Sequence, residues 1–399
     1  MKHGWAAAAQ SGRAASQQGM RRQNLALVMT TVAAHGPMSR AAVAERTGLT
    51  RAAVSSLVDE LHSAGLLTES GSVPSGRAGR PGRALALSER GPAGLGLEVG
   101  VGHLGACVVD LRGEVRVWLR VAAANRNRRA EEVLAELTAV SERAVGEARA
   151  SGLRPVAAVL AVPGLVGDAP GTVERAPNLG WRDVAASELC AHGLPLEVDN
   201  EANLGALAEL WQGAGACDFI HVSAAEGIGA ALVVGGRVFR GARGFAGELG
   251  HVPVRPDGPV CACGARGCLE QYAGEEAVLR QAGLGRGEDA VRRLASRARD
   301  GDRRALGALE RAGEALGTTL AGAVNLVDPA AVVLGGAYAE LGDWLLPGMR
   351  RELATRTLRR WPPEALLVSA LGRRGPLTGA GMAAIRRIIE DPAVWRPTD

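Results

Sequence analysis

The feature that most constrains this chain is a short run of cysteines preceded by a histidine. The spacing is H-x9-C-x-C-x4-C, made by His251, Cys261, Cys263 and Cys268. Three thiolates and one imidazole match a closed tetrahedral Zn²⁺ site, and glycines within the run allow the loop to turn back on the ion. Free surface thiols are the alternative. A site without an open coordination position predicts a structural ion rather than a hydrolytic one.

Composition excludes several protein classes. Six cysteines in 399 residues are too few for a disulfide scaffold. The longest apolar run, 156–167, is interrupted by Pro163 and Gly164, and the N-terminus lacks the apolar core of a signal peptide. We therefore expect a cytoplasmic globular protein of two or three domains, without a membrane span.

The positive charge is concentrated at the N-terminus. Residues 1–90 carry +6 and the whole chain +4, so the remainder is slightly acidic at −2. A basic head on an acidic body favours an anionic partner for the head, with nucleic acid as the first candidate. Charge alone leaves a solvated basic tail as the alternative.

Residues 20–90 follow the pattern of a DNA-binding module, after a tail, 1–19, that we predict to be disordered. Apolar residues recur at helical spacing in three segments, and a turn at Gly48 joins the second to the third. In helix-turn-helix proteins the later of two such helices enters the major groove. Its exposed residues are expected to contact DNA, namely Thr50, Arg51, Ser55 and Ser56.

Two strand-like segments, 66–70 and 84–88, complete this module. The segment SGRAGRPGR between them carries Arg77, Arg80 and Arg83 and predicts a cationic wing for phosphates or a narrow minor groove. A helical bundle used for dimerisation is the alternative. Helix spacing, turn, wing and charge agree, which favours a winged helix-turn-helix.

From Gly91 onward, strand-like segments alternate with helical ones, which indicates an α/β fold. Apolar strands are expected at 95–99 and 156–162, and long helices at 129–150 and 305–327. We predict a small lobe at about 91–197 together with the C-terminal helix, and a large lobe at about 198–377.

The cysteine motif and the segment before it resemble the ROK family of repressors and sugar kinases. The matching stretches are GFAGELGH and CACGARGCLE, and the resemblance extends over residues 20–399. The N-terminal helix-turn-helix is typical of the repressor branch. The resemblance implies an actin-like (ribonuclease-H-like) two-lobed fold for residues 91–399, a sugar in the cleft, and a structural zinc on the His251 motif.

The resemblance also implies a set of sugar ligands. ROK proteins grip the sugar through N-D-x-N, E-x-G-H and the glutamate after the last cysteine, and carboxylates and amides suit vicinal hydroxyls. The corresponding residues here are Asn200, Glu201, Glu248, His251 and Glu270. Asn178 and Trp181 resemble a weaker element of the same pocket, for which local packing is the alternative.

Positions that meet ATP phosphates in ROK kinases are altered here. The D-x-G-G-T turn reads Glu98-Val99-Gly100-Val101-Gly102, and the G-T-G-I-G loop carries Glu226 in place of threonine. Val101 adds bulk, Gly102 removes a donor, and Glu226 would repel a polyphosphate. Glu201 replaces the aspartate that acts as the kinase base. The Gly335-Gly336 pair, an adenosine element in the kinases, is retained.

These observations predict a sugar-responsive transcriptional repressor of carbohydrate uptake or catabolism genes that is not an enzyme. Its expected partners are an operator in double-stranded DNA and a sugar or sugar derivative. Tight operator binding needs paired heads, so a homodimer or homotetramer is expected. The alternatives are an active sugar kinase with a DNA-binding head, and a constitutive DNA-binding or scaffold protein with a vestigial pocket.

Overall fold

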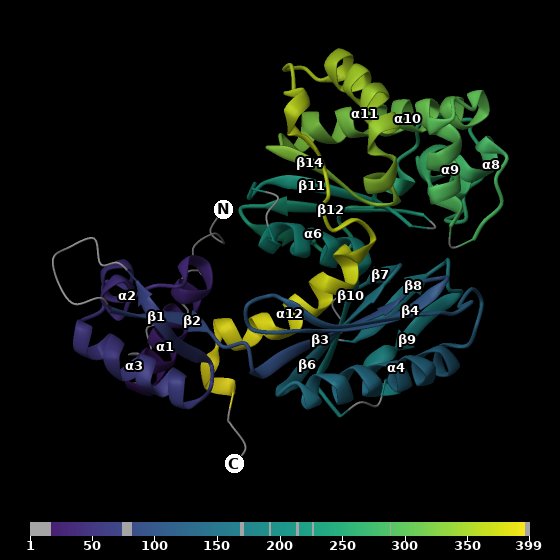
Figure 1. The fold of residues 1–399 in the computed structure, drawn as a ribbon. Coiled ribbons are helices and arrows are strands. Elements are labelled where there is room, and N and C mark those ends of the chain that lie inside the picture. The colour runs from purple at the N-terminus through teal and green to yellow at the C-terminus, as the bar shows by residue number, and fades with distance from the viewer. Residues whose placement is uncertain are drawn as a thin grey trace, which may run out of the picture. The chain divides into compact units, whose positions relative to one another are not determined.

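The computed structural model describes residues 17–73, 82–167, 171–190, 193–212, 215–225, 227–287 and 289–395 (Figure 1). The chain packs into two compact units. The first contains residues 1–92, 110–112 and 385–399, and the second contains 93–109 and 113–384. From the sequence we predict a single domain at 91–399. The structure instead packs residues 385–399 with the N-terminal unit, a tertiary contact that leaves no local pattern in the sequence.

The first unit is a three-helix module with a two-stranded antiparallel sheet. Its N-terminal part forms α1 (Gln17–His35), α2 (Arg40–Thr47), α3 (Arg51–Ser63), β1 (Leu67–Val73) and β2 (Gly82–Leu87). Its C-terminal part holds the end of helix α12 (Gly375–Glu390) and the short helix η4 (Pro392–Val394). The hydroxyl of Ser39 accepts a hydrogen bond from the amide of Ala42 at 3.2 Å and caps α2. Gly48, with φ of 71°, ends that helix in the left-handed conformation.

The apolar stripes predicted from helical spacing form the core of this unit. Leu25, Val28, Met29 and Val32 of α1 are buried, as are Val54, Leu57, Val58 and Leu61 of α3. Helix α1 begins at Gln17, so the predicted tail boundary at residue 19 lies three residues too far along the chain. Polar residues extend the helix there without adding to the apolar stripe. Residues 1–16 lie outside the described part of the chain.

The second unit contains two five-stranded sheets with the same topology. The first sheet has the order β10-β6-β3-β4-β5. Its strands are β3 (Gly91–Val99), β4 (His103–Val109), β5 (Val115–Ala122), β6 (Leu153–Val162) and β10 (Leu196–Asn200). Helix α4 (Ala130–Ala150) covers one face, where its buried side chains share a core with those of β3, β4 and β6. Because β10 continues to Asn200, this lobe ends a few residues beyond the predicted boundary at 197.

The second sheet has the order β13-β12-β11-β14-β15, again a hairpin-linked trio followed by two more strands. Its strands are β11 (Phe219–Ala224), β12 (Ile228–Val234), β13 (Arg237–Phe239), β14 (Ala331–Gly336) and β15 (Leu366–Val368). Its main core also includes α8 (Glu275–Ala282), α9 (Ala290–Arg299), α10 (Arg303–Val327) and α11 (Ala337–Arg356). The repeated strand order confirms the two-lobed α/β architecture expected from the sequence.

Helix α6 (Glu201–Gln212) lies between the two sheets (Figure 1). Its Leu204 packs with residues of β6, and Ala206 packs with residues of β11 and β12. Helix α12 (Gly375–Glu390) contributes Ala380 and Ala384 to the same cluster as Leu204. The start of α6 is therefore anchored to both lobes.

A smaller antiparallel sheet lies beside the first lobe. Its strands are β7 (Leu165–Val166), β8 (Thr172–Ala176) and β9 (Trp181–Ala185), followed by the short helix α5 (Ala186–Leu189). Two further short helices, η1 (Leu249–His251) and α7 (Glu270–Ala273), flank the cysteine run. Across the described residues, no helix combines the length and apolar character that crossing a bilayer requires.

Candidate functional site

The histidine and three cysteines of the predicted metal motif lie together. Their ligand atoms are all within 4.8 Å of one another. Cys261 Sγ is 3.7 Å from His251 Nδ1, and Cys263 Sγ is 3.7 Å from Cys268 Sγ. The edge of a tetrahedron with metal–sulfur bonds of about 2.3 Å is about 3.8 Å long. The four residues thus have the composition and spacing of a tetrahedral metal site.

Backbone geometry holds this loop closed. A Cβ on Gly267 would come within 1.7 Å of the Arg255 carbonyl oxygen, so the close approach of the two segments requires glycine. Burial, reinforced by the neighbouring thiols, raises the pKa of Cys268 above its ordinary value. A bound cation would reverse that effect, since thiolates are the form that coordinates metal.

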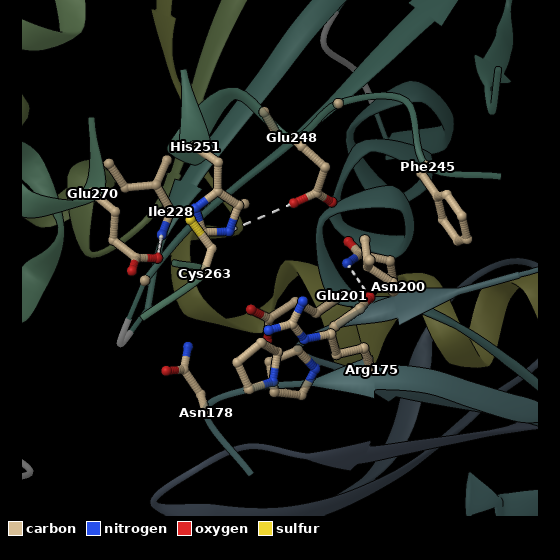
Figure 2. A pocket seen from close by; sticks show the side chains of 18 of the residues that line it. Arg175, Asn178, Asn200, Glu201, Ile228, Phe245, Glu248, His251, Cys263 and Glu270 are labelled. Carbon is tan, nitrogen blue, oxygen red and sulfur yellow. Dashed lines mark hydrogen bonds and ion pairs between the residues drawn. The ribbon is translucent and has the colours of Figure 1, made fainter. Parts of the chain in front are cut away.

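A cavity of about 240 Å³ adjoins the cysteine cluster, and Cys263 forms part of its wall (Figure 2). The structure brings together all five of the predicted sugar ligands, which line this cavity: Asn200, Glu201, Glu248, His251 and Glu270. Asn178, from the weaker family element, lines it as well. Trp181 is instead buried and donates its indole N–H to the Arg128 carbonyl at 3.1 Å, so it packs locally.

His251 connects the cysteine cluster to the cavity. Its Nδ1 faces Cys261, whereas its Nε2 lies 3.8 Å from the Glu248 carboxylate (Figure 2). Burial raises the pKa of Glu248, the nearby Glu270 adds to the rise, and His251 opposes it. A carboxylate on the outer nitrogen of a metal-bound imidazole orients that ring. The same arrangement directs the Glu248 carboxylate into the cavity.

Asn200 has a structural task in addition to its place in the wall. The side-chain Nδ2 of Asn200 donates to the Gly164 carbonyl at 2.7 Å. Its Oδ1 accepts from the backbone N–H of Ala202 at 2.7 Å and so caps α6. Asn203, the second asparagine of the motif, is absent from the wall and donates to Asp199 Oδ1 at 3.0 Å.

Arg240 was not identified from the sequence, yet it supports the same corner of the cavity. Its guanidinium donates both terminal nitrogens to the Asp199 carboxylate, at 3.0 and 2.6 Å. This bond to Asp199 raises the pKa of Arg240. Arg175 and Phe245 also line the cavity. Arg175 belongs to no motif, and Phe245 lies within the GFAGELGH stretch but was given no role there from the sequence.

Glu270 is held by the first residue of β12 and by the glycine that precedes it. The Ile228 amide donates to Glu270 Oε2 at 3.3 Å (Figure 2). A Cβ on Gly227 would lie only 2.2 Å from the same oxygen, so glycine is required for the carboxylate to take this position. Glu226, the neighbouring position that sequence comparison singles out, lies outside the described residues.

The turn at 98–102, which corresponds to the phosphate-binding turn of ROK kinases, is covered by the side chain of His103. His103 Nε2 is 3.2 Å from the carboxylate of the buried Glu98. A Cβ on Gly100 would lie 2.2 Å from the His103 ring, so the imidazole packs directly against the turn. The Gly335-Gly336 turn requires glycine for a local reason, because a Cβ on Gly336 would come within 2.1 Å of the Ala224 carbonyl oxygen.

A larger cavity of about 670 Å³ borders this turn and includes Val101 and Gly102 in its wall. Its arginines are largely engaged with glutamates. Arg126 and Arg286 bind Glu276 at 3.0 and 2.5 Å, and Arg373 binds Glu275 at 2.7 Å. Several cations of this wall are thus already neutralised by carboxylates.

The predicted DNA contacts occupy different environments in the first unit. Thr50 caps α3 by accepting from the Ala53 amide at 3.2 Å, while Arg51, Ser56 and Arg83 are exposed. Ser55 is half-buried, and its hydroxyl accepts from Arg40 Nη1 at 3.1 Å. Arg77 and Arg80 lie outside the described residues.

A family model described as "ROK family" matches residues 94–387. The chain belongs to the ROK family. A second model, described as "MarR family", matches residues 19–78, the segment that holds the three helices and β1 of the first unit. In this ROK chain, a family model therefore matches each of the two predicted parts, the N-terminal helix-turn-helix module and the two-lobed domain that follows it.

Two relatives are similar over more than 90% of this chain. The chain is 29% identical to the xylose repressor of Bacillus subtilis (strain 168), over 94% of this chain and 98% of that protein. Its fold is similar to that of a ROK family transcriptional regulator described as a homolog of the E. coli MLC protein, with a TM-score of 0.76 and 26% identity. That similarity covers 93% of this chain and 98% of the other.

A ROK family glucokinase from Streptomyces griseus, solved in complex with glucose and AMPPNP, is also similar. The TM-score is 0.64 and the identity 30%, over 74% of this chain and 99% of that one. The predicted family and the predicted fold class, a winged helix followed by a two-lobed ROK domain, are confirmed.

Proposed function

We propose that this protein is a sugar-responsive transcriptional repressor of genes for carbohydrate uptake or catabolism. One observation carries the proposal: similarity to a xylose repressor covers 94% of the chain, including the winged helix, whereas similarity to a glucokinase covers 74%. A unit matched by the MarR model and a cavity lined by carboxylate and amide side chains, which suit sugar hydroxyls, support the proposal in a single chain.

The effector of this proposal is a sugar or sugar derivative bound in the cavity beside the cysteine cluster. Glu248 and Glu270 accept hydrogen bonds from sugar hydroxyls, and the Nε2–H of His251 donates beside them. Glu201, at the first turn of α6, accepts from a further hydroxyl. Asn200 fixes the start of that helix and exposes its remaining N–H to the sugar.

A structural Zn²⁺ on His251, Cys261, Cys263 and Cys268 completes the proposed site. The donor set of three soft thiolates and one imidazole, with spacings close to a tetrahedral edge, fits this ion. When bound, zinc supplies charge that keeps the thiolates together. The chain's own contribution is to place Glu248 and Glu270 on either side of the cluster.

We propose further that the body does not phosphorylate its sugar. His103 packs against the turn that would meet phosphate, Glu98 replaces an aspartate there, and Glu201 replaces the kinase base. The competing function is a sugar kinase, which the glucokinase similarity favours. Sugar-dependent ATP hydrolysis that disappears in Glu201→Ala would establish the kinase and reject the repressor-only assignment.

The DNA-binding part of the proposal assigns base contacts to α3, through Thr50, Arg51, Ser55 and Ser56. Phosphate contacts are assigned to the wing arginines Arg77, Arg80 and Arg83. A single winged helix buries too little surface for tight operator binding, so the protein acts as a homodimer or homotetramer in the cytoplasm, where the operator is.

The experiment that tests this function combines two measurements. A thermal-shift screen of monosaccharides and their phosphates identifies the effector, and DNA binding with and without it measures the response. Glu248→Ala should abolish the response and leave basal operator binding intact, whereas Glu142→Ala, on the exposed face of α4, should change neither. If the wild-type protein binds operator DNA but no sugar, the proposed sugar response is rejected and a constitutive DNA-binding protein with a vestigial pocket is supported.

A further inference from the structure

A chain of ion pairs links the recognition helix to the wing in the first unit. Arg40, the first residue of α2, donates Nη1 to the hydroxyl and the carbonyl of Ser55 on α3, at 3.1 and 3.3 Å. The same nitrogen is 2.7 Å from Asp59, also on α3. On its other side the guanidinium donates Nε to Glu69 of β1 at 2.8 Å.

Glu69 is shared between two arginines. One carboxylate oxygen accepts from Arg40, and the other lies 3.4 Å from Nη1 of Arg83 on β2. The Glu69 side chain is 12% exposed, so its charge has lost most of its water. Burial opposes its ionisation, but Arg40 and then Arg83 outweigh burial and hold the pKa of Glu69 below its ordinary value.

The two partners of Glu69 are held to different degrees. Arg40 is 32% exposed and is bound by Ser55 and Asp59 of α3 and by Glu69 of β1. A DNA phosphate could bind Arg40 only after these bonds are broken. Arg83 is 77% exposed and has one long ion pair with Glu69, and solvent-exposed pairs of this kind are weak. A DNA phosphate can therefore compete with Glu69 for Arg83 but not for Arg40.

We propose that Glu69 is a specificity-determining residue of DNA recognition. Through Arg40 it ties the first wing strand to the recognition helix, so that Arg40 is a positioning residue and not a phosphate contact. Through its second oxygen it pairs with Arg83, so that Arg83 does not bind DNA phosphates unless the recognition helix is already in the major groove. Its own negative charge also disfavours binding to arbitrary DNA. This inference rests on the proposed DNA-contacting role of α3 and the wing.

The salt dependence of binding separates these roles. Each phosphate contact adds about 0.9 to the slope of log affinity against log salt concentration, or about 3.5-fold in affinity for a fourfold change in salt. The full-length protein is titrated with a mixed-sequence DNA duplex and with sequences it enriches from a randomised library. Glu69→Gln should bind the mixed duplex more tightly, with a slope steeper by about 0.9, and should enrich its preferred sequences less.

Two further variants make the test specific. Adding Arg83→Gln to Glu69→Gln should return the slope to the wild-type value, since the released cation is then gone. Arg40→Gln should weaken the enrichment of preferred sequences and leave the mixed-duplex slope unchanged. Glu60→Gln is the matched control, because it removes the same charge from an exposed ion pair with Arg21 in the same unit.

The outcomes are distinct. Equal slopes and equal enrichment for Glu69→Gln and Glu60→Gln would overturn the role of Glu69. A slope reduced by about 0.9 in Arg40→Gln would show that Arg40 is a phosphate contact after all. If Glu69→Gln unfolds, Arg83→Gln alone still tests the proposal. A salt slope on the mixed duplex that is smaller by the full value of about 0.9 would mean that Arg83 already binds phosphate there and that Glu69 does not restrain Arg83. Absence of any DNA binding by the wild type would instead reject the proposed function itself.

Discussion

The buried imidazole of His221 is expected to make the stability of the second unit depend on pH. His221 lies on β11, is 2% exposed, and has no hydrogen-bond partner for Nδ1 among the described residues. Glycines leave room for the ring on both sides, since a Cβ on Gly205 or Gly335 would lie 2.8 or 2.5 Å from its atoms. Burial lowers the pKa of His221 to about 4.

The sign follows from the direction of this shift. As the pH falls through about 6.5, the unfolded chain binds a proton that the folded chain cannot accept until about pH 4. Stability is therefore lost across this window as the pH falls, at about 1.4 kcal/mol per pH unit. Acidifying from about pH 7 to about pH 4.5 should remove about 2.5 kcal/mol through this one residue.

Urea unfolding of wild type and His221→Leu at a series of pH values measures the effect. Leucine has no titrating group, so the difference in unfolding free energy between the two proteins should change by about 2.5 kcal/mol across the window, in favour of the variant at low pH. His35→Leu makes the same exchange at an exposed position and removes no buried imidazole. Parallel pH curves for wild type and His221→Leu would refute the reasoning.

Three further perturbations test the site and the first unit. Cys263→Ser should lower zinc content and melting temperature together, as metal analysis and calorimetry of the purified protein will show; full zinc content would contradict the ligand assignment. Gly227→Ala should push the Glu270 carboxylate out of place, since the Cβ would lie 2.2 Å from it, and should weaken sugar affinity while zinc content is retained. Trp395→Phe removes the indole N–H that donates to the Ala64 carbonyl at 2.8 Å and should destabilise the first unit by about 1 kcal/mol, whereas an unchanged unfolding midpoint would show that this bond contributes nothing.

Features encoded over a few neighbouring residues were predictable from the sequence. The turn at Gly48 and the apolar stripes depend on residues within one or two helical turns, so spacing alone reveals them. The metal motif is similar, because four ligands within eighteen residues can meet around one ion with only a local loop. The pocket residues became predictable through the family motifs that carry them.

Tertiary structure decided how those residues are used. Asn200 could be assigned to the pocket from its motif, but its bond to the Gly164 carbonyl depends on the segment before β7 lying beside the end of β10. Ser55 was predicted to face DNA, yet Arg40 from the preceding helix engages its hydroxyl. Neither partner choice leaves a periodic trace in the sequence.

The C-terminal segment shows the same limit most clearly. Asp391 binds Arg22 of α1, and Trp395 donates a hydrogen bond to the carbonyl of Ala64 at the end of α3, although hundreds of residues separate these partners along the chain. Local propensity fixes which segments become helices and strands, since that choice depends on neighbouring residues. Which distant segments bury one another depends on the packing of the whole chain, and so the composition of the DNA-binding unit was decided only by the tertiary structure.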